Sequence, residues 1–188
     1  MRRKTFDAIL TAGGGVLFVV LIVAGIFLTL SANFANSNVH SQLAEQAITF
    51  PPASAFAHAK PGTEITPGMR PYLLRYAGQP LTTGPEAKAY ADHFIAVHLS
   101  EMPYGGVYSK ASAAAQADPT NAKLQGLVNT IFKGTTLRGL LLEAYAFSVF
   151  GEIATWASIA VWVLAGVMAV LTILGVIHQR RTAPTAEM

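Results

Sequence analysis

The chain contains no cysteine, so no disulfide bond stabilises any part of it. Only 12% of its 188 residues are charged and 52% are hydrophobic, a balance typical of membrane proteins. The net charge of +3 does not describe a basic domain, because residues 31–152 carry eight Lys or Arg and eight Asp or Glu. The basic excess is split between the two ends of the chain, which argues against nucleic acid as a partner.

Sequence motifs of catalysis and cofactor binding are also missing. Gly105-Gly106 lacks the lysine and serine that follow in a phosphate-binding loop. No serine stands in the pattern of a nucleophile elbow. We therefore predict no catalytic residue and no cofactor from motifs.

Two long uncharged stretches, residues 8–30 and 153–177, dominate the sequence. Each exceeds the roughly 20 apolar residues that a helix needs to cross a bilayer. Lys and Arg flank both stretches on their outer sides, so the positive-inside rule predicts two cytoplasmic termini in the plasma membrane. The expected division is cytoplasmic 1–7, membrane helix 8–30, extracytoplasmic 31–152, membrane helix 153–177 and cytoplasmic 178–188.

The first stretch has an alternative interpretation as a cleaved signal peptide, because Arg2, Arg3 and Lys4 precede it. It is longer than the usual apolar region of 7–15 residues, and Leu30-Ser31-Ala32 is a mediocre cleavage site. An uncleaved membrane anchor is the expectation.

The middle segment reads as helical, because apolar residues recur at helical spacing and none of it alternates like a strand. Thr83-Gly84-Pro85-Glu86 predicts a helix start, and that helix should end near Pro103. Asp118 should cap a further helix that Gly134 closes, with Thr135 or Thr136 capping the last helix. The predicted fold class is all-α, with two transmembrane helices bracketing a small helical extracytoplasmic domain.

The densest group of possible metal ligands is His93, His98 and Glu101. On a helix, His98 and Glu101 share a face, but His93 lies about 140° away. These three are weak candidates, and a structural role in the core or at the surface is favoured. Glu143 and Glu152 precede the second apolar stretch, which leaves an interfacial role or a proton or cation role open.

Small residues recur at spacings of three and four in both apolar stretches, which predicts that they pack as an antiparallel hairpin. Two alternatives stay open: small residues are common in such helices, or one seam faces another subunit. The predicted seam consists of Ala8, Ala12, Gly15, Val19, Ile22 and Ile26 with Ala154, Ser158, Val161, Ala165 and Thr172.

Several segments together resemble a known family. They are RRKTFD at residues 2–7, AYADHFIAVHL at 89–99, TLRGLLL at 136–142 and AYAF at 144–147. Over nearly its whole length the chain resembles a family of small actinobacterial membrane proteins. The resemblance implies this architecture and an actinobacterial origin. Members often carry the label aromatic ring-opening dioxygenase LigA, which implies iron held by two histidines and a carboxylate.

Three functions follow as hypotheses. The first is a non-enzymatic accessory or scaffold subunit of a cell-envelope membrane complex. The second is an outward-facing ligand-binding or sensory module that acts through a partner. The third is the metal-dependent dioxygenase that the label implies. The expected partners are the lipid bilayer and either a second copy or another membrane protein.

Overall fold

The structure is a computed structural model that describes residues 3–181, and every regular element in that range is helical. An isolated β-bridge joins Thr49 to Pro80. The all-α prediction is therefore confirmed for the described residues. The chain divides into two units, of which one contains α1 up to Phe34 and α7 from Phe150, and the other is Ala35–Val149.

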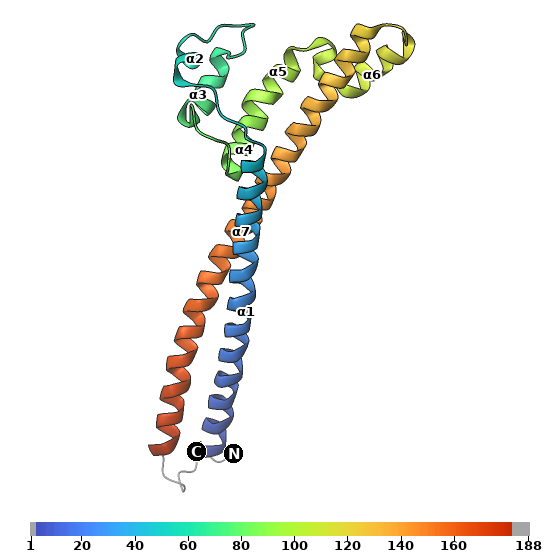
Figure 1. Ribbon diagram of the computed structural model, residues 1–188. Coiled ribbons are helices and arrows are strands. Elements are labelled where there is room, and N and C mark those ends of the chain that lie inside the picture. The colour runs from blue at the N-terminus through green and yellow to red at the C-terminus, as the bar shows by residue number, and fades with distance from the viewer. Residues whose placement is uncertain (1–2, 182–188) are drawn as a thin grey trace. The chain divides into compact units, whose positions relative to one another are not determined.

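The first unit consists of parts of the two long helices, α1 (Arg3–Glu45) and α7 (Ala122–Arg181). Each helix contains a segment long and apolar enough to cross a membrane, with mean hydropathy of 2.7 and 2.6. Within the unit the helices run antiparallel and side by side (Figure 1). Thr11 lies against Gly175 at one end of this pair, and Gly25 lies against Trp162 further along.

The second unit combines the remaining parts of α1 and α7 with short helices. These are α2 (Ala53–Ala57), η1 (Pro67–Met69), α3 (Arg70–Leu73), η2 (Leu74–Tyr76), α4 (Gly84–Tyr90), η3 (Ala91–Ile95), α5 (Ala96–Glu101), η4 (Pro103–Gly106) and α6 (Tyr108–Ala117). Their apolar side chains form one core with those of α1 and α7. Its largest fully buried members include Phe50, Phe56, Met69, Leu73, Leu81 and Leu141.

One continuous helical rod is formed by α4, η3 and α5, and its middle element is a π-helical turn. The rod starts as the sequence predicts. Glu86 Oε2 accepts hydrogen bonds of 2.8 Å from the backbone N–H groups of Thr82 and Thr83. This satisfies donors that would otherwise have no partner at a helix start. The π turn has no counterpart in the periodicity of the sequence.

The expected break at Gly134 is wrong, because α7 passes through this residue without interruption. A Cβ at Gly134 would lie only 2.9 Å from Leu99 Cδ2, so the glycine provides room for α5 to pack. Thr135 caps no new helix, since its hydroxyl donates to the Ile131 carbonyl at 2.8 Å. The start of α7 is capped by Asn121, not Asp118, through Oδ1 and the N–H groups of the next turn.

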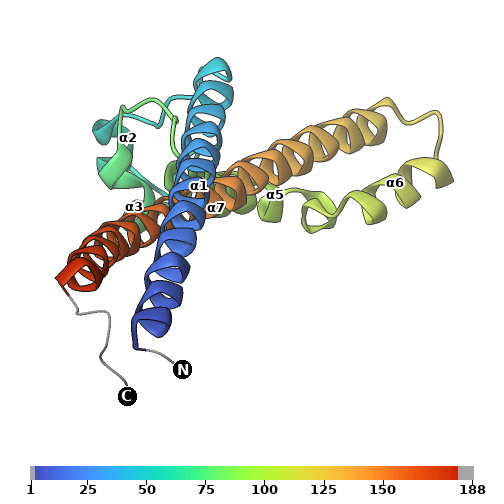
Figure 2. The same ribbon diagram turned by 90° about the horizontal axis from the view of Figure 1, so that it is seen from below.

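The first turns of α7 pack against α6, as both views show (Figures 1 and 2). Gln125 Nε2 donates to the Ala115 carbonyl at 3.3 Å. Ala111 and Ala115 of α6 and Ile131 of α7 are buried. Small side chains on α6 therefore permit the two helices to approach closely.

Candidate functional site

An ion-pair network joins α7 to the π turn. An Nη atom of Arg138 lies 2.9 Å from Asp92 Oδ1, and its Nε donates to the Ala91 carbonyl at 3.3 Å. Lys88, one turn earlier than Asp92, places Nζ 2.6 Å from Asp92 Oδ2. Both carboxylate oxygens of Asp92 therefore accept hydrogen bonds from cations, and α7 is tied to the turn where the helical hydrogen-bond pattern changes.

The electrostatics of this network favour the charged forms. The hydrogen bond from Lys88, with a further one from Arg138, holds the pKa of Asp92 below its ordinary value of 3.8. The same hydrogen bond raises the pKa of Lys88. Burial raises the pKa of the neighbouring Tyr90 phenol. Asp92 is thus a stably ionised structural carboxylate at neutral pH, unsuited to exchange a proton.

The three weak metal-ligand candidates are engaged in separate places. His93 stacks on Tyr72, with ring centroids 3.6 Å apart and planes within 3°. His98 Nδ1 lies 2.8 Å from the Phe94 carbonyl; a carbonyl only accepts, so Nδ1 carries the hydrogen in this contact. Glu101 is exposed. Among the described residues, His, Asp and Glu form no group of three or more that could hold a metal ion.

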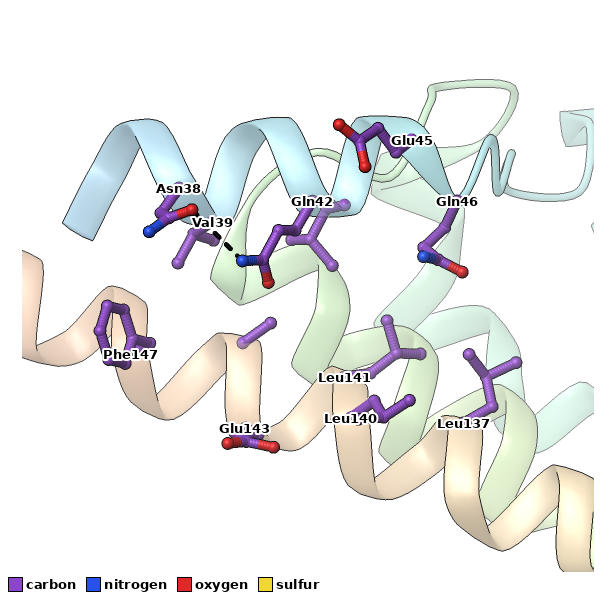
Figure 3. A pocket seen from close by; sticks show the side chains of 12 residues that line it. Asn38, Val39, Gln42, Glu45, Gln46, Leu137, Leu140, Leu141, Glu143 and Phe147 are labelled. Carbon is purple, nitrogen blue, oxygen red and sulfur yellow. Dashed lines mark hydrogen bonds between the residues drawn. The ribbon is translucent and has the colours of Figure 1, made fainter. Parts of the chain in front are cut away.

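A groove of about 520 Å³ lies between α1 and α7 in the second unit (Figure 3). Its floor includes Val39, Leu43 and Leu141, which are buried members of the core. Its walls and rim carry Asn38, Gln42, Glu45, Gln46, Leu137, Leu140, Glu143, Ala144 and Phe147. The groove combines an apolar interior with amides and carboxylates along its edges.

The residues of the predicted seam differ in how far they are buried. On α7, Ser158 and Ala165 are buried, and Ala154 and Val161 are half-buried. On α1, Ala8 and Gly15 are half-buried. Ala12 and Val19, however, are exposed, the latter by 57%.

The face of α1 that contacts α7 is rotated from the predicted face, because the two helices approach each other most closely at glycines of α1. Gly14 faces Thr172, and Gly25 faces the Trp162 indole so closely that a Cβ there would lie 3.0 Å from the ring. The Trp162 indole N–H donates to Thr29 Oγ1 at 3.1 Å, and that hydroxyl donates to the Gly25 carbonyl at 2.8 Å. Close helix approach at small residues is how apolar helices gain dispersion contacts.

Two features of the second unit escaped prediction from the sequence. The Asp92–Arg138 pair joins residues 46 positions apart, and only the Lys88–Asp92 half of the network has the helical spacing that a sequence reveals. The groove likewise joins two distant segments. Glu143 lies on its rim, whereas Glu152 is an exposed residue of the first unit.

Comparison of the chain with known protein families, curated proteins and solved structures finds no match. Function must therefore be argued from the geometry of this molecule.

We expect Asp92→Asn to destabilise the second unit at neutral pH by up to about 1 kcal/mol, the range of partly exposed ion pairs. Because the folded-state pKa of Asp92 is lowered, its contribution is present above pH 3.8 and is lost as the pH falls through the lower folded value. Thermal unfolding of the wild-type protein and the Asp92→Asn variant at pH 7, 5 and 3 should show that their difference in stability shrinks at acid pH. Glu101→Gln, which removes an exposed carboxylate, is the control; a gap constant with pH would contradict the assignment.

We expect Gly14→Cys with Thr172→Cys to form an intramolecular disulfide under mild oxidation. A Cβ at Gly14 lies 3.1 Å from Thr172 Oγ1, compatible with the short Cβ–Cβ distance of a disulfide. Val19→Cys with Ala165→Cys should not crosslink within one chain, since Val19 is exposed. Electrophoresis after cleavage at a protease site inserted near His58 distinguishes the two pairs. Crosslinking of the Val19→Cys and Ala165→Cys pair without crosslinking of the Gly14→Cys and Thr172→Cys pair would support the seam expected from the sequence.

Proposed function

We propose that the protein is a non-enzymatic integral membrane protein of the plasma membrane that serves as an accessory or scaffold subunit of a cell-envelope complex. The observation that carries this proposal is the apolar surface of the first unit. Only 11% of the most apolar window of α1 and 6% of that of α7 is buried. A core helix of a soluble protein would be mostly buried.

The large apolar side chains exposed on both helices support insertion in a bilayer. Phe27, Trp156 and Val163 are each exposed by more than 60%, and many Leu, Ile and Val residues on both helices resemble them. Covering one such side chain is worth about 1.5–3 kcal/mol, and soluble monomers rarely expose contiguous apolar patches of this extent. Hydrocarbon accepts the same surface at no cost.

The orientation follows from charge. Arg180 and Arg181 end α7, and Asp7 near the start of α1 lies 3.9 Å from His178, so both ends of the hairpin are at one side. With Arg2, Arg3 and Lys4 also at this side in the sequence, the positive-inside rule assigns it to the cytoplasm. Residues 35–149 are then extracytoplasmic.

A partner within the membrane is supported by the face of α1 that α7 leaves uncovered. The exposed residues Ala12, Val16, Val19, Val23 and Ile26 recur at spacings of four and three. Small and β-branched side chains in such a row suit packing against a further membrane helix. This face fits a second copy or another membrane protein. Predicted seam residues that do not contact α7 would then contact this partner.

The ligand-binding or sensory alternative is favoured by the groove between α1 and α7, whose volume lies in the range of small-molecule sites. The dioxygenase that the family label implies has less support. It requires two histidines and a carboxylate on one iron, whereas His93 and His98 contact Tyr72 and the Phe94 carbonyl. The resemblance to actinobacterial membrane proteins supports the architecture.

We expect alkaline phosphatase fused after Lys110 to be active in cells and the same enzyme fused after Arg181 to be inactive. Alkaline phosphatase folds only outside the cytoplasm, and the proposal places these positions on opposite sides of the membrane. Fusions to a cytoplasmic reporter at the same positions provide the control with inverted activity. Activity only after Arg181 would refute the orientation, and equal activity at both sites would refute the two-span arrangement.

We expect a photo-crosslinker attached at Val19→Cys to capture a discrete protein adduct in membranes of the native host. The chain lacks native cysteine, so labelling is specific. Leu17→Cys, which is exposed on a different face of α1, is the matched control and should yield mainly lipid adducts. Mass spectrometry distinguishes a second copy from another membrane protein. Lipid adducts alone at both positions would contradict a subunit role.

A further inference from the structure

We propose that the groove between α1 and α7 holds one acyl chain of a phospholipid from the bilayer. This inference rests on the membrane insertion proposed above. Three observations carry it: an apolar interior that no charged side chain enters, a short distance along each helix to its apolar segment, and an exposed apolar stripe on α7 that covers this distance.

The interior of the groove is apolar and uncharged. Val39, Leu43 and Leu141 form a preformed floor, because they also belong to the core of the second unit. Figure 3 shows the carboxylates of Glu45 and Glu143 on the outer sides of α1 and α7, directed away from the groove. A preformed floor spares a bound chain the entropy cost of ordering the protein, and a chain that covers the floor removes apolar surface from water.

The amides of the lining offer little to a polar ligand. Gln42 Nε2 donates to Asn38 Oδ1 at 3.2 Å, so these two amides are engaged with each other (Figure 3). Sites for polar small molecules contain polar groups that fix the orientation of the ligand. An acyl chain has no polar group to satisfy, and it fits a groove whose polar side chains are paired with each other or turned outward.

Each wall of the groove continues into an apolar segment. On α1 the lining begins at Asn38, eight residues after Leu30, which is about 12 Å of helix. On α7 the lining ends at Phe147, six residues before Ile153, which is about 9 Å of helix. An acyl chain spans one leaflet, about half of the roughly 30 Å hydrocarbon core, so its length exceeds both distances.

An apolar stripe on α7 joins the lining to the apolar segment. Leu140, Phe147 and Phe150 are exposed by 58%, 44% and 68%. Their spacings of seven and three residues place them on one side of the helix. Phe150 stands between the lining and Ile153. A chain that leaves the bilayer along this stripe stays against apolar surface, and it covers side chains that the protein leaves exposed.

The dimensions favour a single chain over a partner helix. The lining of α1 runs from Asn38 to Gln46, which is about 12 Å at 1.5 Å per residue. A docked helix would contact this groove for only about two turns. The volume of about 520 Å³ falls within the 300–1,000 Å³ of typical ligand sites.

Photo-crosslinking of the full chain in nanodiscs of phosphatidylcholine tests the proposal. A fraction of the lipid carries a diazirine at the end of one acyl chain, and tandem mass spectrometry locates the adducts. We expect adducts on the groove residues of α1 and α7 in addition to adducts on the apolar segments 8–30 and 153–177. Helix α6, which belongs to the same unit but contributes nothing to the lining, should carry none.

The variants locate the site. Ala144→Trp, which fills the groove, should remove the groove adducts and leave those on the apolar segments. Gly139→Trp is the matched control, because Gly139 lies outside the lining and a Cβ there has nothing within 4 Å. Leu140→Gln changes an exposed wall residue and should lower the groove adducts by placing an amide in the path of the chain. Circular dichroism verifies the fold of each variant.

Four outcomes overturn the proposal. Adducts on the apolar segments with none on the groove would refute this inference and leave the membrane insertion standing. Absence of adducts on the apolar segments would refute the insertion on which both proposals rest. Groove adducts that survive Ala144→Trp would place the chain elsewhere. Disulfide-linked dimers of Ala144→Cys without groove adducts in the wild-type protein would show that a second copy occupies the groove.

Discussion

The structure depends on the unbroken hydrogen-bonded backbone of two helices, α1 and α7. In an apolar segment every N–H and C=O must find its partner within the chain, and a helix achieves this without water. Both helices continue well past their apolar segments, α1 to Glu45 and α7 back to Ala122. The same two helices therefore form the hairpin of the first unit and two sides of the core in the second.

The second unit adds one departure from regular helix, the π turn at Ala91–Ile95. A π turn costs regular hydrogen-bond geometry and is retained where other contacts stabilise it. Arg138 provides such contacts by donating to the Ala91 carbonyl and to Asp92. On the other side of the turn, His93 stacks on Tyr72. The turn is thus held from α7 and from α3, which explains why its histidine is occupied in packing.

The features that local chemistry determines were predictable from the sequence. Long uncharged runs predict the apolar helices, and Thr83 with Glu86 predicts the start of α4, since both signals lie within a few residues. Gly134 shows the limit. A glycine ends a helix or makes room for a neighbour, and only the position of Leu99, distant in sequence, decides between them. The hairpin has the same ambiguity, because both the Gly14–Gly25 face and the Ala12–Val19 face offer small residues.

The groove and the ion-pair network share an origin that no local signal reveals. Arg138 and Glu143 lie on the same helix five residues apart, a spacing that is imperfect for pairing because helical pairs lie three or four residues apart. The structure instead directs the Arg138 guanidinium to Asp92 at 2.9 Å. That guanidinium neutralises the carboxylate at the π turn, and the groove lining receives no basic side chain. The way α7 is tied to the π turn therefore decides which side chains are left for the groove: Arg138 is held at Asp92, while Leu137, Leu140 and Leu141 of the same helix line the groove.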